Sequence, residues 1–592
     1  MMWRAMTDAR TDSKPSAKPG APAGAPADGA GTSLMKHLFL GETPAELLFP
    51  FPTLQGEARE LVDMFRETLA RFAAIHVDSR AIDKAHAIPP EVLNGLAELG
   101  LFGIRVPEEY GGLGLTDTQY VRIGTELSVL DGAIAIMSGG HSTIGIKALL
   151  LAGSAEQRAR YLPRLATGEL KAAFALSEPG AGSDAQALRC TATRTPDGRA
   201  YLLNGEKLWI TNGGFANLVT VFARTPDHPR ADGRPSISCF LVERAHGFRA
   251  GPEEDKLGIR GSSTVPLFFE DVRVPAENLV GEPGHGFKLA LAVLNAGRTG
   301  LAGGCVGICR YLLAQAVEYT SQRRQFDRPI AEFELIREKL ARMAQDIHAL
   351  ECMTFLTTGA ADAGRKDLAL EAAACKVFGT ETLWSVVNDA MQCAGGNGFT
   401  TDYPYERLLR DARVNMIFEG TNEILRLMIA SGGLAEPARR LQAGIAPREG
   451  YGRRVSGAEA PVPLPVPEAL QSEALALSLG AADLAQTSAS ALRAHGPALK
   501  DRQLVLARLA DQAIALYGQA AVLARAALPP AAGPRGAGAD AAAEQLLARG
   551  ACRRLAARAR AAVAALRDND DALLLETAAL VRQTGGLPGE PI

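Results

Sequence analysis

Residues Arg410–Ala430 read RDARVNMIFEGTNEILRLMIA and place one carboxylate, that of Glu419, where a loop meets a helix. The run before it, Val414–Phe418, is almost entirely apolar, and the sequence offers no evident cationic partner. Apolar residues then recur at helical spacing, Thr421 is a suitable N-cap, and Glu423 lies in the first turn. Loss of water raises the pKa of such a carboxyl toward neutrality, as proton abstraction from a weakly acidic C–H requires. Taken alone, a Glu-Gly-Thr tripeptide is more often an exposed loop.

Four other segments give this glutamate its context, and they occur in a fixed order along the chain. They are FALSEPGAGSDA (Phe174–Ala185), GEKLWITNGG (Gly205–Gly214), RRQFDRPI (Arg323–Ile330) and QCAGGNGF (Gln392–Phe399). Together with the Glu419 segment they resemble the acyl-CoA dehydrogenases, and most of all the very-long-chain branch of that family. The likeness extends from about His37 to Ala430 and continues more weakly beyond. It implies a mainly α fold with a central β domain.

Composition limits the class of protein. A chain of 592 residues is too long for one core, and 47% hydrophobic with 22% charged residues is typical of a soluble globular protein. The net charge of −3 gives no reason to expect nucleic-acid binding, and no uncharged apolar run reaches the roughly 18 residues of a membrane helix. The eight cysteines are scattered without zinc spacing, so we expect reduced core thiols, no metal site and a cytoplasmic location.

Changes in composition and hydrophobic pattern along the chain predict its domain organisation. Residues 1–34 are rich in Ala, Pro, Gly and Ser, lack an apolar signal core and are expected to be a disordered tail, with a transit peptide as the alternative. We expect an N-terminal helical domain over residues 35–171, an antiparallel β barrel or sandwich over 172–287, and a four-helix bundle over 288–435. A linker over 436–467 then leads to a C-terminal helical extension over 468–586.

Local signals support these regions. Ser154–Gln157 has the form of a capping box and predicts a helix start. Within the β region, short runs of β-forming residues are separated by Asp197-Gly198, Asn204-Gly205 and Asn212-Gly213, which predict hairpin turns.

The stretch Gly180–Ala185 (GAGSDA) matches the GxGxxA fingerprint of dinucleotide-binding folds. That fingerprint requires a helix directly after the glycines and a parallel strand after the helix. Here Leu188–Thr193 has the composition of a strand, and an Asp-Gly turn follows it. The context therefore favours a glycine-rich loop at a strand end, where backbone can approach a flat ligand closely.

The family resemblance implies an FAD site divided between two subunits, and hence a homodimer. Phe174–Ser183 and Trp209–Thr211, called here the flavin-wall segments, would line the isoalloxazine ring, although a lone strand tryptophan more often packs in a core. Arginine and glutamine of RRQFDRPI would reach the pyrophosphate of the neighbouring subunit's FAD, and the glycine loop after Gln392 its adenosine side. The residues implied are Phe174, Leu176, Ser177, Gly182, Ser183, Trp209, Ile210, Thr211, Arg323, Gln325, Phe326, Gln392, Gly395, Gly396, Thr421 and Glu423.

The resemblance also implies the reaction, which is α,β-dehydrogenation of a fatty acyl-CoA to its trans-2-enoyl-CoA in fatty acid β-oxidation. Glu419 would remove the α-proton while the β-hydride moves to flavin N5, and an electron-transfer flavoprotein would accept the electrons. Arg298 matches a buried arginine at the substrate cavity, and a helix cap or an interface salt bridge is an equal alternative. The substrate residues implied are Ser183, Asn295, Arg298, Phe418 and Gly420.

Chain length and membrane contact have weaker signals. Small residues at Ser138–His141 would leave room for a long acyl tail, or would serve close helix packing. The arginines Arg549, Arg553, Arg554, Arg558 and Arg560 in the C-terminal extension could meet anionic headgroups, or form a solvated basic face.

Two other functions remain open. A flavin oxidase or monooxygenase on the same fold would pass electrons to oxygen, so the oxygen reactivity of the reduced flavin separates it from a dehydrogenase. A dehydrogenase-derived assembly or scaffold protein would be recognised by its binding partners and by the absence of bound flavin.

Overall fold

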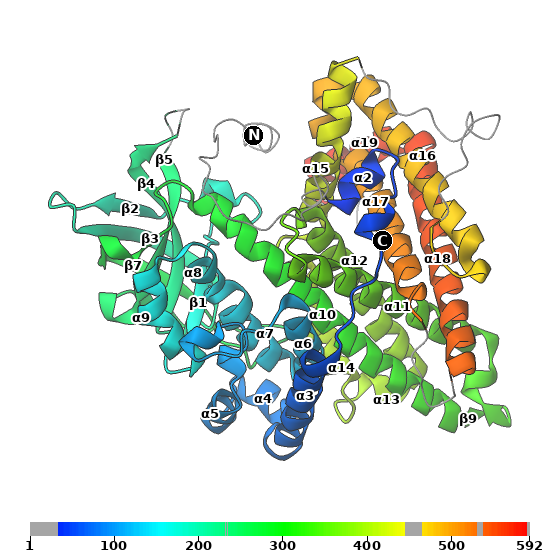
Figure 1. Ribbon diagram of the computed structural model, residues 1–592, viewed down its shortest axis with the longest axis horizontal. Coiled ribbons are helices and arrows are strands. Elements are labelled where there is room, and N and C mark those ends of the chain that lie inside the picture. The colour runs from blue at the N-terminus through cyan, green and yellow to red at the C-terminus, as the bar shows by residue number, and fades with distance from the viewer. Residues whose placement is uncertain (1–32, 231–232, 234, 445–463, 530–536, 589–592) are drawn as a thin grey trace. The chain divides into compact units, whose positions relative to one another are not determined.

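The computed structural model describes residues 33–230, 233, 235–444, 464–529 and 537–588. It consists of two compact units: one is Phe51–Ile424, and the other combines Met1–Pro50 with Leu425–Ile592 (Figure 1). Most of the expected tail and part of the expected linker lie outside the described residues. The described chain opens with Ser33, whose side chain accepts a hydrogen bond from the backbone of Lys36 and caps helix α2.

The larger unit begins with helices whose starts carry the expected capping signals. Ser154 and Gln157 form the predicted capping box at the start of α9, and Thr116 and Gln119 form another at α6. The helices are α3 (Gly56–His76), α4 (Ser79–Ala85), α5 (Pro90–Glu98), α6 (Asp117–Leu130), α7 (Gly132–Gly139), α8 (Lys147–Ala152) and α9 (Ala155–Ala166).

A π-helix, η4 (Gly140–Gly145), follows directly on α7. A β-carbon at Gly140 would lie 3.0 Å from side-chain atoms of Thr211 and Asn212, and one at Gly145 would lie 2.9 Å from the β-carbon of Ala172. Glycine therefore allows this helix to press directly on the first and third strands of the sheet. Such π-turns are rare and frequently occur at functional sites.

The β region forms one eight-stranded sheet in the order β6-β7-β3-β2-β4-β5-β8, with β1 joined to β4 (Figure 1). Most pairings are antiparallel, as expected, but β1 and β2 each run parallel to β4. One face packs on α8, α9 and the start of the next long helix, and residues of the other face form a separate core. The strands are β1 (Ala172–Ala175), β2 (Thr191–Arg194), β3 (Ala200–Thr211), β4 (Leu218–Pro229), β5 (Pro235–Glu243), β6 (Arg249–Ala250), β7 (Thr264–Pro275) and β8 (Leu279–Val280).

Only one of the three predicted hairpin turns is a hairpin. Asp197-Gly198 joins the antiparallel strands β2 and β3 as expected. The prediction for Asn204-Gly205 is wrong, because these residues lie inside β3, where the register shifts against β7 and Gly205 has φ 140°. Asn212-Gly213 does form a turn, but the strands that it connects, β3 and β4, are separated by β2 in the sheet. The predicted strand at Leu188–Thr193 begins only at Thr191.

Long helices follow the sheet, and α10, α11 and α12 pack against one another as the expected bundle requires. The short strands β9 (Arg324–Gln325) and β10 (Arg328–Pro329) separate the first two of them. The helices are α10 (Gly286–Gln322), α11 (Glu334–Asp362), α12 (Ala369–Ala394), α13 (Gly396–Phe399), α14 (Tyr405–Arg413) and α15 (Asn422–Gln442), the last of which crosses from one unit into the other.

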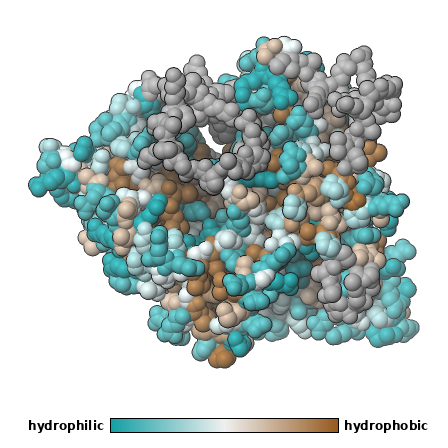
Figure 2. Space-filling model, viewed as in Figure 1, coloured by the Kyte–Doolittle hydropathy of each residue, from teal (hydrophilic) through white to brown (hydrophobic). Residues whose placement is uncertain are grey.

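Among the described residues, two helical stretches, Gly132–Ala152 and Gly286–Gln322, have the length and mean hydropathy of membrane spans. Both stretches include charged residues, so neither is the uncharged apolar run that the sequence criterion required. Core helices of soluble proteins meet the same test, and both stretches contribute side chains to the buried core here. Figure 2 shows a face on which hydrophilic areas surround smaller apolar ones, which is ordinary for a folded protein in water.

The second unit joins the first described helix to the C-terminal helices. Although α2 was expected to open the N-terminal helical domain, it packs on α16 and α17. A β-carbon at Gly433 would lie 2.2 Å from the ring of Phe39, and one at Gly41 would lie 3.3 Å from Ala485, so the contact is close. The helices are α2 (Leu34–Phe39), α16 (Gln471–His495), α17 (Gln503–Ala526), α18 (Ala537–Arg567) and α19 (Asp571–Thr584).

Candidate active site

The loop between α14 and α15 holds Glu419 in an unusual backbone conformation. Glu419 has φ 59° and Gly420 has φ 90°, so two consecutive residues adopt positive φ. The hydroxyl of Thr421 accepts a hydrogen bond from the backbone of Ile424 (3.3 Å), which confirms its predicted role as an N-cap. Left-handed conformations of residues other than glycine are costly and cluster at functional sites.

The Glu419 carboxylate lies against α10 at a glycine. A β-carbon at Gly297 would be 2.9 Å from both carboxylate oxygens, so any side chain there would displace the carboxylate. Its Oε2 atom is buried and accepts no hydrogen bond from any residue that the structure describes. Burial raises the pKa of Glu419 to about 7, as the apolar flanking sequence predicted.

The expectation that Glu419 lacks a cationic partner is wrong. Two positive charges, Arg298 of α10 and Lys376 of α12, face it and oppose the rise in its pKa. Burial is the larger effect and lowers the pKa of both cations, that of Lys376 to about 8. Both come from helices remote in sequence, so local composition did not reveal them.

These two cations also bind the backbone of the loop. Arg298 Nε donates to the carbonyl of Glu419 (3.2 Å), and its Nη1 donates to Asn295 Oδ1 (2.9 Å). Lys376 Nζ donates to the carbonyl of the next residue, Gly420 (2.9 Å). Arg298 is buried in the middle of α10, which excludes the helix-cap alternative.

With both carbonyls engaged, the backbone N–H of Glu419 remains available. No described residue accepts a hydrogen bond from it. The site therefore combines a buried base with an uncommitted N–H donor on the same residue, which suits a reaction in which negative charge develops on an oxygen near the base.

The two flavin-wall segments lie side by side. The backbone of Leu208 donates to the carbonyl of Ser177 (3.0 Å), which joins β3 to the loop after β1. A buried ion pair reinforces this join: Lys207 Nζ contacts Glu178 Oε1 at 2.8 Å and also donates to the carbonyl of Leu176 (3.1 Å). The backbone of Cys190 donates to the same Glu178 carboxylate.

The surface that these segments present fits a flat aromatic ligand. Trp209 has φ 58° and is 60% exposed, which excludes the core-packing alternative. A β-carbon at Gly180 or Gly182 would meet nothing within 4 Å, so the glycine loop faces open space. Leu176 and Ile210, by contrast, belong to the core clusters, so only their backbone is available to a ligand.

The π-helix connects the flavin-wall segments to the base. Gly140 lies against Thr211, and on the same π-helix Thr143 lies 3.6 Å from the position of a β-carbon at Gly300 of α10. Gly300 is one helical turn from Gly297, which contacts the Glu419 carboxylate.

The other predicted cofactor residues range from buried to fully exposed. Phe174 is buried and stacks near Phe222, with ring centroids 5.1 Å apart, whereas Phe326 is 88% exposed. The predicted substrate residue Phe418 and the cap Thr421 are half-buried. The exposed members of the predicted set are Gly182, Ser183, Arg323, Gln325, Phe326, Gln392, Gly395, Gly396 and Glu423.

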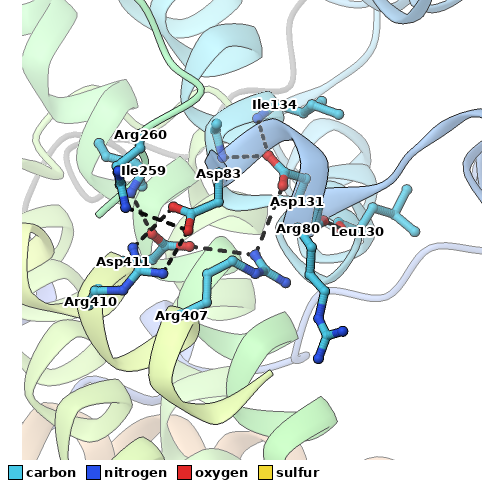
Figure 3. A network of polar contacts seen from close by, with 12 residues as sticks. Arg80, Asp83, Leu130, Asp131, Ile134, Ile259, Arg260, Arg407, Arg410 and Asp411 are labelled. Carbon is cyan, nitrogen blue, oxygen red and sulfur yellow. Dashed lines mark hydrogen bonds and ion pairs between the residues drawn. The ribbon is translucent and has the colours of Figure 1, made fainter. Parts of the chain in front are cut away.

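A network of aspartates and arginines braces the segments that carry the site (Figure 3). Arg410 of α14 makes two hydrogen bonds to Asp83 of α4, at 2.7 and 3.0 Å. Asp411 accepts the backbone N–H of Ile259, and Arg407 lies between Asp411 (3.6 Å) and Asp131 (3.9 Å), which caps α7. The network therefore ties α4, α7 and the loop before β7 to the helix that precedes Glu419.

Sequence reasoning missed Gly297, Lys207, Glu178 and Lys376. A lysine inside an apolar stretch is a usable signal, because lysine is almost never fully buried without a partner. Lys376 stands in AAACKVFG and Lys207 in a strand of alternating burial. Gly297 carries no such signal, because nothing in the local sequence shows what its missing side chain would meet.

Comparison with known protein families matches nearly the whole described chain. The models match residues 59–169 (acyl-CoA dehydrogenase, N-terminal domain), 173–272 (middle domain) and 284–434 (C-terminal domain). A fourth model, the ACAD9/ACADV C-terminal domain, matches residues 468–583.

Individual relatives agree with the family models. The mitochondrial very long-chain specific acyl-CoA dehydrogenase of Homo sapiens is 40% identical over 510 residues, which cover 83% of this chain and 78% of that protein. A crystal structure of an acyl-CoA dehydrogenase complexed with FAD from Bacillus anthracis has a TM-score of 0.76 and 32% identity, covering 94% of this chain and 96% of that one. Butyryl-CoA dehydrogenase from Megasphaera elsdenii has a TM-score of 0.60 and 34% identity, covering 65% and 99%.

Proposed function

This chain belongs to the acyl-CoA dehydrogenase family, and from this membership we propose that it oxidises long-chain fatty acyl-CoA thioesters with Glu419 as the base. The family assignment makes it an FAD-dependent oxidoreductase of fatty acid oxidation. Three observations on one residue support the identity of the base: the Glu419 Oε2 atom is buried, the pKa of the carboxyl is raised, and the backbone N–H of Glu419 is uncommitted among the described residues.

Proton abstraction from the α-carbon is the difficult step. The α-C–H of a thioester is a weak acid, so a carboxylate with an ordinary pKa would be a poor base for it. A pKa of about 7 increases the basicity of Glu419 and still leaves a large ionised fraction at neutral pH. The carboxylate Oε2, which accepts no hydrogen bond from a described residue, is free to receive the proton.

Negative charge would develop on the thioester carbonyl oxygen as the proton leaves. The backbone N–H of Glu419 is the donor that this chain offers to that oxygen. A donor of this kind contributes about 3 kcal/mol to the stability of a transition state. Arg298 and Lys376 would orient it, because they bind the two carbonyls that follow it along the backbone.

The bound FAD supplies the acceptor for the hydride of the β-carbon. Residues of the flavin-wall segments would hold its ring system: the exposed indole of Trp209 offers a stacking surface, and the open glycine loop offers backbone N–H groups. The buried Lys207–Glu178 pair would keep the two segments in register.

Long acyl chains are the substrates that the sequence and the relatives favour. Gly139 and Gly140 lie at the junction of α7 and the π-helix, where larger side chains would occupy space next to the sheet. The ACAD9/ACADV C-terminal domain is the second support, since the relatives that carry very long-chain in their names share most of this chain.

The rest of the proposal concerns partners. Homodimerisation would complete the FAD site, because Arg323, Gln325 and Gly395 are exposed and available to a neighbouring subunit. An electron-transfer flavoprotein would accept the electrons, and the protein would act in the cytoplasm, with peripheral membrane contact through the arginines of α18.

The test is to mix the purified flavoprotein with palmitoyl-CoA under anaerobic conditions and to monitor the absorbance of the oxidised flavin. Native protein should bleach within the mixing experiment, and Glu419→Gln should retain flavin but bleach at least about 10²-fold more slowly. Flavin that stays oxidised with acyl chains of every length would contradict the proposal. Rapid reoxidation of the bleached protein by oxygen would instead favour an oxidase.

A further inference from the structure

Lys376 is a fully buried lysine, and no carboxylate of a described residue bonds to its ammonium. It lies in the second turn of α12, and its relative exposure is 0%. Its Nζ donates to the carbonyl of Gly420 (2.9 Å) and to the side-chain oxygen of Asn422 (2.8 Å), both on the Glu419 loop. Burial of a charged group among neutral acceptors is costly, so this lysine needs an explanation beyond packing.

The acceptor Asn422 is itself held in one orientation. Its Nδ2 donates to Thr380 Oγ1 (3.1 Å) and to Glu381 Oε1 (3.0 Å), both of which follow Lys376 on α12. This orientation turns the Asn422 oxygen toward the lysine. The start of α15 is therefore fixed to α12 by the hydrogen bonds of Asn422 as well as by Lys376, so the loop does not depend on the lysine alone to stay in place.

The positive charge of Lys376 can also act on Glu419, because the two side chains attract each other. The charged groups around the base come from two helices. Helix α10 supplies Arg298 and α12 supplies Lys376, whereas Cys305 of α10 and Glu381 of α12 act on Lys376. Among the described residues, Arg298 and Lys376 are the cations that act on Glu419, and they bind two successive carbonyls, those of Glu419 and Gly420.

We propose that Lys376 is a positioning residue for the Glu419 base: its ammonium fixes the Gly420 carbonyl and keeps the buried Glu419 carboxylate in its proton-accepting form at neutral pH. The two parts reinforce each other. A carboxylate taken out of water would otherwise become protonated, and a protonated Glu419 cannot act as the base. The proposal rests on Glu419 being the base of the proposed reaction.

Three substitutions separate charge from shape. Lys376→Met removes the charge and the hydrogen bonds but keeps the length of the chain, Lys376→Gln keeps donors without the charge, and Lys376→Arg keeps the charge. Thr380→Val is the matched control, because it removes a neutral hydrogen bond from the same Asn422.

Two measurements are needed on each flavoprotein. The first is the pH profile of kcat/KM with palmitoyl-CoA. The second is the protonation of the Glu419 carboxyl itself, followed by infrared difference spectroscopy over pH and assigned by subtracting Glu419→Gln. The infrared signal requires no turnover, so it distinguishes failure of this inference from failure of the proposed function.

In the Met and Gln variants the protonation midpoint of Glu419 should rise by about one pH unit or more, because a nearby opposite charge is removed. The rate at neutral pH should fall by about tenfold for each unit of that rise. The Lys376→Arg variant and the Thr380→Val control should keep the native protonation midpoint of Glu419. A native midpoint in the Met and Gln variants, with only their melting temperatures lowered, would overturn the proposal and leave Lys376 a structural residue.

Discussion

Glu419, the proposed base, adopts a backbone conformation that residues other than glycine avoid. A left-handed φ of this kind costs on the order of 1–3 kcal/mol, and the surrounding structure has to enforce it. Here Arg298 and Lys376 bind the two carbonyls that define the turn. The same two side chains supply the positive charge that moderates the effect of burial on the pKa of the carboxyl.

The raised pKa of Glu419 predicts a pH dependence. The base must be ionised to act, so kcat/KM for palmitoyl-CoA should rise with pH and level off above about 7. Below that value it should fall about tenfold for each pH unit. Steady-state rates in overlapping buffers would measure this, and an acid limb centred near 4.5 would show that the carboxyl is solvated in the working enzyme.

Gly297→Ala should inactivate the protein without unfolding it. The new methyl would lie 2.9 Å from both carboxylate oxygens and push the carboxylate away from α10. Misplacement of a reacting group by about 1 Å costs on the order of 10²-fold in rate. Single-turnover bleaching measures the rate and thermal unfolding checks the fold.

Gly300→Ala is the control for that substitution. One helical turn away, its methyl would meet Tyr120 and Thr143 at 3.5–3.6 Å, which is ordinary contact. It should bleach at a rate close to that of the native protein. Equal losses in both variants would mean that helix propensity or packing, and not the carboxylate, explains the effect of alanine in α10.

The sequence predicted the burial and raised pKa of Glu419, the proposed base, but not the two cations that face it. The apolar run before Glu419 and the cap after it are local, so composition predicts both burial and a helix start. Arg298 lies 121 residues away from the carbonyl that it binds, and Lys376 lies 44 residues from its own. Contacts at that separation are created by packing of α10 and α12, which no local pattern encodes.

At the scale of elements, the flavin-wall segments depend on a buried ion pair. Lys207 and Glu178 are almost completely buried and join β3 to the loop after β1. Removal of one partner from such a pair leaves the other charge buried without compensation.

Lys207→Met should therefore lower the free energy of unfolding by about 3–5 kcal/mol and release flavin. Bound flavin per chain, read from the visible spectrum after gel filtration, measures the second effect. The double variant Lys207→Met/Glu178→Gln should recover part of the free energy of unfolding and part of the bound flavin, because no isolated buried charge remains. A double variant no better than the single one would indicate that the lysine acts through the Leu176 carbonyl instead.

Strand positions were predicted better than their connections. Strands β1 to β8 all lie within the region 172–287 where strands were expected, but Asn204-Gly205, a common turn pair, lies within β3. A β-carbon at Gly205 would lie 2.8 Å from the α-carbon of Cys190, so the glycine is needed for close approach in a bulge. Glycine for a turn and glycine for a bulge look the same in one sequence.

At the scale of the whole molecule, buried titratable groups set the response to acid. His141 is fully buried and accepts the backbone N–H of Ala172, and burial lowers its pKa to about 4. The unfolded chain takes up that proton near pH 6.5, so stability is lost as the pH falls from about 6.5 to 4. Burial raises the pKa of Asp411 to about 6, which has the opposite sign, because acid relieves its buried charge.

His141→Gln should remove the loss of stability in acid that comes from His141 and leave the effect of Asp411 in place. The native protein should lose about 3 kcal/mol more than the variant between pH 6.5 and 4, and the two should show parallel curves above pH 7. Urea unfolding at a series of pH values measures the difference. Parallel curves across the whole range would show that His141 is reached by water and protonates in the folded state.

Phe39→Ala should weaken the unit that contains the C-terminal helices. Phe39 is 1% exposed and packs on Gly433, and its truncation typically costs about 3–5 kcal/mol. Hydrogen exchange should become faster in α16 and α17 and stay unchanged in α10 and α12. Ile75→Ala, at a residue that is 78% exposed, is the control. Faster hydrogen exchange throughout both units would contradict the expectation that the effect stays within the unit that contains Phe39.

The packing of α2 on α16 and α17 also affects how the protein can be made. A ribosome adds about 5–20 residues per second, so α2 leaves it on the order of tens of seconds before its partners are synthesised. During that interval the residues Phe51–Ile424, which form a compact unit by themselves, can already fold. The apolar side chains of Leu34–Phe39 meanwhile remain uncovered on the nascent chain, a natural binding site for a chaperone until translation ends.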